Sequence, residues 1–143
     1  MGILKARIQK SVRPSVWLYQ AEKGADQEEY RKAVSIAAGE NSADFHTFGP
    51  EKSGLKIREI LAPESAEKQT DAEAVPTEPV LLINGFSSKE LDRFLASLHG
   101  RCAERGLPGI DLKAVVTPVN SGWIFSELVR ELQSEHRLMH GKD

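Results

Sequence analysis

Phe48-Gly49-Pro50-Glu51-Lys52-Ser53-Gly54-Leu55-Lys56-Ile57-Arg58-Glu59-Ile60-Leu61 is echoed 68 positions later by Val116-Thr117-Pro118-Val119-Asn120-Ser121-Gly122-Trp123-Ile124-Phe125-Ser126-Glu127-Leu128-Val129. The two stretches share Pro, Ser, Gly and Glu at equivalent places. The pairs Leu55/Trp123, Ile57/Phe125, Ile60/Leu128 and Leu61/Val129 keep apolar character. Upstream, residues 16–19 correspond to residues 80–83 at an offset of 64. Repetition of this kind indicates one supersecondary unit used twice around a shared core.

Within the first half, strand-like and helix-like patterns alternate. Residues 16–19 are β-branched, apolar and aromatic, which predicts a buried strand. Asp26-Gln27-Glu28-Glu29 has the spacing of a capping box, so we expect a helix from there to about Gly39. A second strand is predicted at residues 44–48, and Ser53 or Gly54 is expected to open a short helix.

The second half repeats this order. Residues 80–83 predict a strand, and Ser87-Ser88-Lys89-Glu90 is a capping box at the start of a helix. Residues 112–116 predict the last strand. A final helix carrying Trp123 is expected to follow, with Asn120 or Ser121 as its N-cap.

The alternation predicts an α/β fold in which two βαβα halves, an internal pseudo-repeat, form one mostly parallel or mixed sheet flanked by helices. We place the halves at residues 1–61 and 79–143. Residues 62–78 between them are acidic, rich in proline and poor in large apolar side chains. They are expected to form a mobile linker, because they cannot offset the entropy of ordering by burial.

Composition restricts the class of protein. The chain has 143 residues, 40% of them hydrophobic and 28% charged, with a formal net charge of −2. We therefore expect a soluble protein with no membrane segment and no general affinity for nucleic acid. A single cysteine, Cys102, suits a reducing compartment, so a cytoplasmic location is predicted. The basic residues of segment 1–13 indicate either an arm that contacts phosphates or acidic partners, or a partly packed edge element.

A resemblance to a known family comes from the second half. Its most specific part is Leu112-Lys113-Ala114-Val115-Val116-Thr117-Pro118 followed by Asn120 and Trp123. With the neighbouring Pro79 to Phe86 and Glu131-Leu132, residues 79–136 resemble the bacterial family known as domain of unknown function 3783. Gly122 and Ile124 depart from the family's usual residues. No activity is established for that family, so the resemblance implies no functional residues.

The repeated loops are the best candidate sites for a ligand. Thr117, Asn120 and Trp123 stand where a predicted strand passes into a helix, and N–H groups there can bind an anion. The alternative is structural, with Asn120 as a cap and Trp123 in the core. Lys52 and Ser53 stand in the equivalent loop, which lacks the glycine and lysine spacing of a nucleotide-binding loop.

No catalytic residue, metal ligand or cofactor is predicted. His99 and Cys102 are three residues apart and His136 and His140 four apart, but neither pair has the further ligands that zinc requires. We expect these to be exposed helix residues. The preferred hypothesis is therefore a non-enzymatic interaction or regulatory module, with a homo-oligomer or a protein as partner. The alternative is a binder of a small anion or nucleotide, or an enzyme acting on one, that uses loops 49–54 and 117–123.

Overall fold

The structure is a computed structural model that describes residues 13–21, 26–62 and 76–140. One sheet contains its four strands in the order β2-β1-β3-β4. Their bounds are β1 Ser15–Tyr19, β2 Asp44–Phe48, β3 Val80–Asn84 and β4 Leu112–Val115. Most of the predicted linker and of the basic arm lies outside the described residues, so both predictions remain untested.

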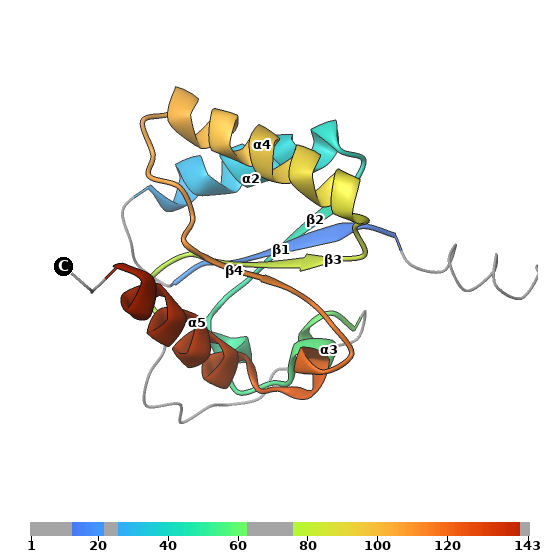
Figure 1. Cartoon of the computed structure of the whole chain (residues 1–143), viewed down its shortest axis with the longest axis vertical. Helices are drawn as coiled ribbons and strands as arrows, with labels where there is room; N and C mark the ends of the chain where they lie inside the picture. The colour runs from blue at the N-terminus through green and yellow to red at the C-terminus, as the bar shows by residue number, and fades with distance from the viewer. Residues whose placement is uncertain (1–12, 22–25, 63–75, 141–143) are drawn as a thin grey trace, which may run out of the picture.

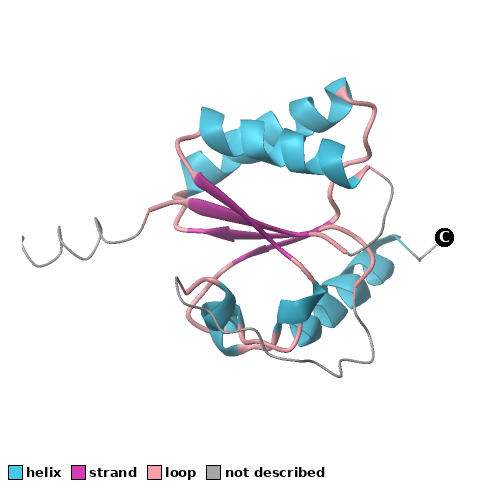
Figure 2. Ribbon diagram, turned by 180° about the vertical axis from the view of Figure 1, so that it is seen from behind, coloured by secondary structure: helices cyan, strands magenta, loops and turns pink. Residues whose placement is uncertain are grey.

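Helices cover both faces of the sheet (Figures 1 and 2). α2 (Gln27–Glu40) and α4 (Ser88–Glu104) pack together on one face. α3 (Ile57–Ile60) and α5 (Phe125–His140) lie on the other, each preceded by a 3-10 turn, η1 (Pro50–Lys52) or η2 (Asn120–Gly122). The predicted fold class is confirmed: each half runs β-α-β-α, and the sheet is mixed.

The two halves join through their first strands. β1 pairs antiparallel with β3, whereas β2 runs parallel to β1 and β4 runs parallel to β3. Because β1 and β3 are the inner strands and have helices above and below, both carry apolar side chains on both faces. This explains why residues 80–83 are a continuous apolar run without alternation.

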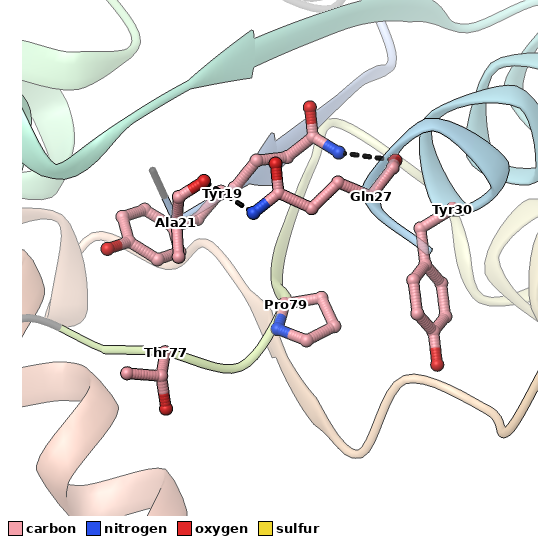
Figure 3. A pocket seen from close by; sticks show the side chains of 7 residues that line it. Tyr19, Ala21, Gln27, Tyr30, Thr77 and Pro79 are labelled. Atoms are coloured by element: carbon pink, nitrogen blue, oxygen red, sulfur yellow. Dashed lines mark hydrogen bonds between the residues drawn. The ribbon is translucent and has the colours of Figure 1, made fainter. Parts of the chain in front are cut away.

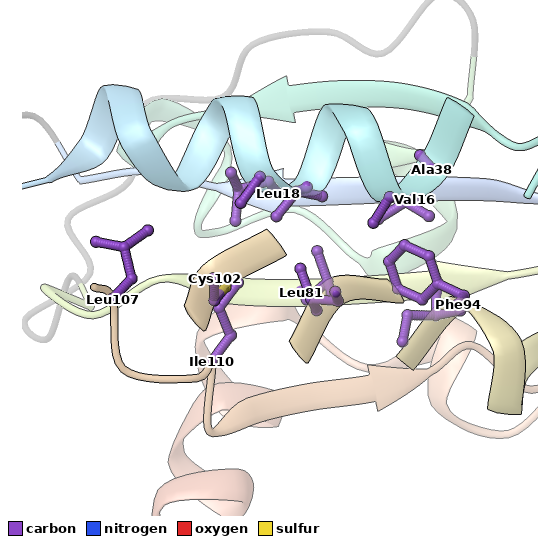
Figure 4. Packing of buried hydrophobic residues seen from close by; sticks show 13 residues of the cluster. Val16, Leu18, Ala38, Leu81, Phe94, Cys102, Leu107 and Ile110 are labelled. Carbon is purple, nitrogen blue, oxygen red and sulfur yellow. The ribbon is translucent and has the colours of Figure 1, made fainter. Parts of the chain in front are cut away.

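Successive side chains of the inner strands enter two separate cores. Val16, Leu18 and Leu81 pack with Phe94 and Cys102 under α2 and α4 (Figure 4). On the opposite face Tyr19, Phe48 and Phe125 form a group of aromatic rings with centroids 5.0 to 5.6 Å apart. Truncation of such a ring to alanine typically costs about 3–5 kcal/mol.

Equivalent residues of the two repeats pair with each other on the α3 and α5 face. Ile57 N–H donates to the carbonyl oxygen of Trp123 at 2.9 Å, and Phe125 N–H donates to the carbonyl oxygen of Leu55 at 2.9 Å. Between them Lys56 forms an antiparallel bridge with Ile124. Residues 57 and 125, 55 and 123, and 56 and 124 are each 68 positions apart. Exchange of the two halves therefore turns one hydrogen bond into the other and leaves the bridge unchanged, as an approximate twofold axis requires.

The helices after the loops begin later than the sequence indicated. α3 starts at Ile57 and α5 at Phe125, so neither Ser53 nor Asn120 caps an α-helix. The reason is tertiary: the preceding residues form 3-10 turns, and the N–H groups of Ile57 and Phe125 are taken by the other half.

Of the two predicted capping boxes, one is present. Ser87 accepts from Glu90 N–H at 3.2 Å and Glu90 accepts from Ser87 N–H at 2.8 Å, as predicted. The box at Asp26 is wrong, because Asp26 adopts a left-handed backbone with φ 65° and its side chain makes no cap hydrogen bond.

Candidate functional site

The repeated loops are neighbours in the fold. Residues 49–54 lead from β2 to α3 and residues 117–123 lead from β4 to α5. The hydrogen bonds that link the two halves begin where these loops end. The residues predicted as ligand contacts therefore occupy two connected segments, and their own bonding determines what they can bind.

Asn120 closes the carboxyl end of the outer edge of β4. Val116 N–H donates inward to Ile83 O at 2.8 Å, so the carbonyl of Val115 and the N–H of Thr117 point away from the sheet. The Asn120 amide satisfies both groups: Nδ2 donates to Val115 O at 3.0 Å, and Oδ1 accepts from Thr117 N–H at 2.8 Å. One side-chain amide thus replaces the backbone of a neighbouring strand.

The rest of the second loop is also bonded internally. Asn120 N–H donates to Thr117 Oγ1 at 3.1 Å, Ser121 N–H to Thr117 O at 2.9 Å and Trp123 N–H to Asn120 O at 3.0 Å. An anion site at a loop needs N–H groups without protein partners. The anion site at Thr117, Asn120 and Trp123 therefore gains no support from the geometry and stays a prediction.

Trp123 does not fill the core. Its side chain is 39% exposed, whereas Leu55 at the equivalent position is buried. The buried place next to the other aromatic rings is occupied by Phe125, at the start of α5.

The first loop has the same turn without the amide. Ser53 N–H donates to Pro50 O at 3.0 Å, and the Ser53 side chain is fully buried with no hydrogen-bond partner for Oγ within the described structure. Lys52 stands at the position equivalent to Asn120, and Gly49 at that of Thr117. Neither residue carries a side-chain amide, so this loop has no counterpart of the Asn120 group that bonds a carbonyl and an N–H at once.

β2 consequently has an open outer edge. Asp44 N–H donates toward β1 at 3.0 Å and Phe48 O accepts from the same side at 2.9 Å, so Phe45 and Thr47 turn their backbone groups away from the sheet. β2 pairs with β1 alone among the described strands, and no backbone group of the described residues bonds to the outward N–H and C=O groups of Phe45 and Thr47. Thr47 and His46 are exposed.

Side chains hold the β2 edge in place on the α3 and α5 face. The His46 ring stacks on Trp17 with centroids 4.1 Å apart, and Trp17 Nε1–H donates to Ser15 Oγ at 3.0 Å. Arg13 donates two hydrogen bonds to the Asp44 carboxylate at 3.0 and 3.1 Å. This guanidinium lowers the pKa of Asp44, so the carboxylate is ionised and paired at neutral pH.

Two hollows lie away from the loops. The first, of about 80 Å³, lies between the end of β1 and the first turn of α2 (Figure 3). Gln20 Nε2 donates to Gln27 O at 2.7 Å there, and Tyr19 Oη–H donates to Pro76 O at 2.8 Å. Its volume is far below the several hundred Å³ of typical ligand pockets.

The second hollow, of about 300 Å³, lies between α4 and the segment that precedes β4, and His99 and Cys102 both line it. Cys102 is 2% exposed and packs near Leu107 and Ile110, so the expectation that it is exposed is wrong (Figure 4). Burial raises the pKa of its thiol, which keeps it protonated and a poor nucleophile at neutral pH. His99 is exposed, as expected.

Neither a group of metal ligands nor a membrane-spanning helix is present among the described residues. Across residues 13–21, 26–62 and 76–140 no three His, Cys, Asp or Glu side chains come together in a way that could hold a metal ion. Among the described helices, none has the length and apolar character needed to cross a membrane.

Comparison with known proteins finds a family match for the C-terminal part of the chain. Residues 79–139 match the family model described as a domain of unknown function, DUF3783. This range is less than half of the chain and covers β3, α4, β4 and nearly all of α5, so the resemblance predicted for residues 79–136 is confirmed. No curated protein matches the chain.

Similarity to solved structures is remote. Malonate semialdehyde decarboxylase is 13% identical, with 82% of this chain and 97% of that chain covered and a TM-score of 0.37. Macrophage migration inhibitory factor of Toxoplasma gondii is 13% identical, with 72% and 88% covered and a TM-score of 0.29. At these scores neither likeness bears on function.

The difference between the two sheet edges is not predicted from the sequence. Its signal lies in the alignment of the repeats, where Asn120 aligns with Lys52 and Thr117 aligns with Gly49. The sequence indicates Asn120 as a helix cap or an anion ligand, because local sequence does not reveal the strand order that makes β4 an edge.

Proposed function

We propose that this protein is a non-enzymatic interaction module that binds a protein partner by adding a strand to the outer edge of β2. The observation that carries the proposal is the contrast between the two edges of one sheet. The Val115 carbonyl of β4 and the Thr117 N–H that follows it are bonded to Asn120, whereas among the described residues no strand and no side-chain amide bonds to the outward groups of Phe45 and Thr47 on β2. An unprotected edge is a template for pairing with another chain.

The side chains along β2 suit an interaction edge. Proteins that keep an edge unpaired usually protect it with lysine or another charge. Lys113 has that place on β4, and its Nζ donates to Ile110 O. The equivalent residue on β2 is Phe45, which is partly buried and uncharged. The one acidic side chain of β2, Asp44, is paired with Arg13.

The alternative, a ligand site in the two loops, receives less support. The N–H groups of Thr117, Asn120 and Trp123 have protein partners, and neither hollow described above is lined by residues of these loops. The buried, protonated Cys102 thiol likewise favours a role other than catalysis. We include the predicted cytoplasmic location in this proposal.

Thr47→Pro tests the proposed edge. Proline removes the outward N–H of Thr47 and places a ring where an added strand would lie, and edge strands tolerate it because that N–H makes no bond within the sheet. The matched control is Val115→Pro at the equivalent position of β4, where the carbonyl bond to Asn120 remains. The measurement is retention of proteins from a lysate of the native cells on each immobilised variant, with mass spectrometry.

We expect the wild type and Val115→Pro to retain the same partner, which can be a second copy of this chain. Retention by Thr47→Pro should be at least about tenfold lower, which corresponds to the loss of a strand-adding contact worth about 1.4 kcal/mol. Circular dichroism verifies that both variants are folded. Equal retention by all three forms would refute the proposal.

A further inference from the structure

We infer that the strand added to β2 comes from a second copy of this chain, in an antiparallel β2–β2 dimer with Phe45 opposite Thr47 of the other copy and His46 opposite His46. This inference rests on the proposed function and names its partner. It joins two four-stranded sheets into one continuous sheet of eight strands.

The hydrogen bonds of β2 select this register. Each copy offers the N–H and C=O groups of Phe45 and of Thr47, four groups in all. With Phe45 opposite Thr47 of the second copy, both outward residues form hydrogen-bonded pairs, and all four groups of each copy are satisfied.

The neighbouring symmetric registers satisfy fewer groups. Phe45 opposite Phe45 would place Thr47 opposite Ala43, whose N–H already donates to Ala38 O at 2.9 Å. Thr47 opposite Thr47 would place Phe45 opposite Gly49, whose carbonyl already accepts from Lys52 N–H at 3.1 Å. Of these three registers, the one that pairs Phe45 with Thr47 places no outward group of either residue opposite a group that is already hydrogen-bonded.

The side chains agree with the register. Phe45 of one copy lies beside Thr47 of the other on the α2 and α4 face, twice per dimer, and an aromatic residue beside a β-branched one is a favourable cross-strand pair. No residue from Phe45 to Thr47 is acidic or basic apart from His46, and the flanking Asp44 is neutralised by Arg13. The edge therefore presents no carboxylate, lysine or arginine of its own that would repel a copy of itself.

Partial occupation of the β4 edge favours a finite assembly. A protein with two fully open edges adds copies on both sides and forms filaments. Among the described residues, Asn120 bonds the outward carbonyl of Val115 and the N–H of Thr117 on β4, whereas the outward N–H and C=O groups of Phe45 and Thr47 all remain at the β2 edge. Pairing of that edge with itself is isologous, and it stops at two copies.

Engineered disulfides test the register. In a Cys102→Ala background, which removes the native thiol, His46→Cys places two thiols directly opposite each other with Cα atoms about 4.5 Å apart. Thr47→Cys is the matched control, because its copies lie diagonally at about 7–8 Å, beyond normal disulfide reach. We expect oxidised His46→Cys to form a covalent dimer at least about tenfold faster than Thr47→Cys.

Light scattering on the unmodified chain completes the test. At high micromolar concentration we expect twice the 15.8 kDa mass of one chain, and a monomer for Thr47→Pro. Thr47→Lys, which puts a charge on the exposed edge, replaces Thr47→Pro should the proline variant fail to fold.

A monomeric wild type overturns the inference. So does a dimer that survives Thr47→Pro and Thr47→Lys, and so does Thr47→Cys that links as fast as His46→Cys. Edge-dependent retention of a different protein by a monomeric wild type would overturn the dimer and leave the proposed function standing.

Discussion

Asn120 shows how a single side chain decides what a sheet edge can do. Its amide presents a donor and an acceptor at the spacing that a strand offers between one carbonyl and the N–H two residues later. Val115 O and Thr117 N–H are therefore satisfied without a fifth strand. The same residue type that the sequence indicated for a cap serves here to protect an edge.

Asn120→Ala removes both side-chain bonds. Because the freed groups lie at the surface and water replaces the amide, we expect a loss of about 1–2 kcal/mol in the free energy of unfolding, measured by urea denaturation. All outward groups of β4 are then open to a further strand, so light scattering should show species larger than the dimer. Ser121→Ala, which removes a loop bond to Pro118 O away from the edge, is the control and should leave the mass unchanged.

At the scale of single elements, the strength of a capping signal depended on the backbone around it. Ser87 has the extended conformation of an N-cap, and both reciprocal bonds with Glu90 form. Asp26 has the same Asp-x-x-Glu spacing, but its left-handed backbone directs the side chain away from the helix N–H groups. Spacing alone could not separate the two cases.

Ser87→Ala and Asp26→Asn make this difference measurable. Loss of the Ser87 hydroxyl should lower the free energy of unfolding by about 1 kcal/mol, because an N-terminal donor of α4 loses its partner. Asp26→Asn should change it by less than about 0.5 kcal/mol, since no cap bond exists to lose and asparagine also tolerates the left-handed region. Equal effects in thermal or urea unfolding would contradict the assignment.

The whole molecule is held together across its two halves. β1 and β3 pair along five residues at the centre of the sheet, and the first turn of α5 bonds to Leu55 and Ser53 of the first half. Each of the two inner strands has a strand of its own half as one neighbour and the inner strand of the other half as its second neighbour. We therefore expect the predicted halves at residues 1–61 and 79–143 to unfold as one unit.

The two tryptophans, one in each half, can test this cooperativity. Trp17 lies in β1 and Trp123 lies after β4, so Trp123→Phe and Trp17→Phe give proteins whose fluorescence reports on one half each. We expect urea transitions that coincide with circular dichroism in both variants, after allowance for the small stability change of each substitution. Separate transitions for the two reporters would show that the halves are independent domains.

The sequence by itself determined the elements and their order. The apolar runs of β1 and β3, the amphipathic pattern of α4 and the spacing of the repeats are local properties, and each strand lies within about one residue of its predicted place. Only the tertiary structure decided which strands became edges, because strand order depends on how the halves pack against each other. With that order, Asn120 protects the β4 edge instead of capping a helix, and β2 is an open edge among the described strands. α3 and α5 begin only at the residues that form hydrogen bonds between the repeats, and Cys102 is buried beneath the turn that follows α4. The strand order and the bonds between the repeats depend on contacts between residues far apart in the chain, which no local pattern encodes.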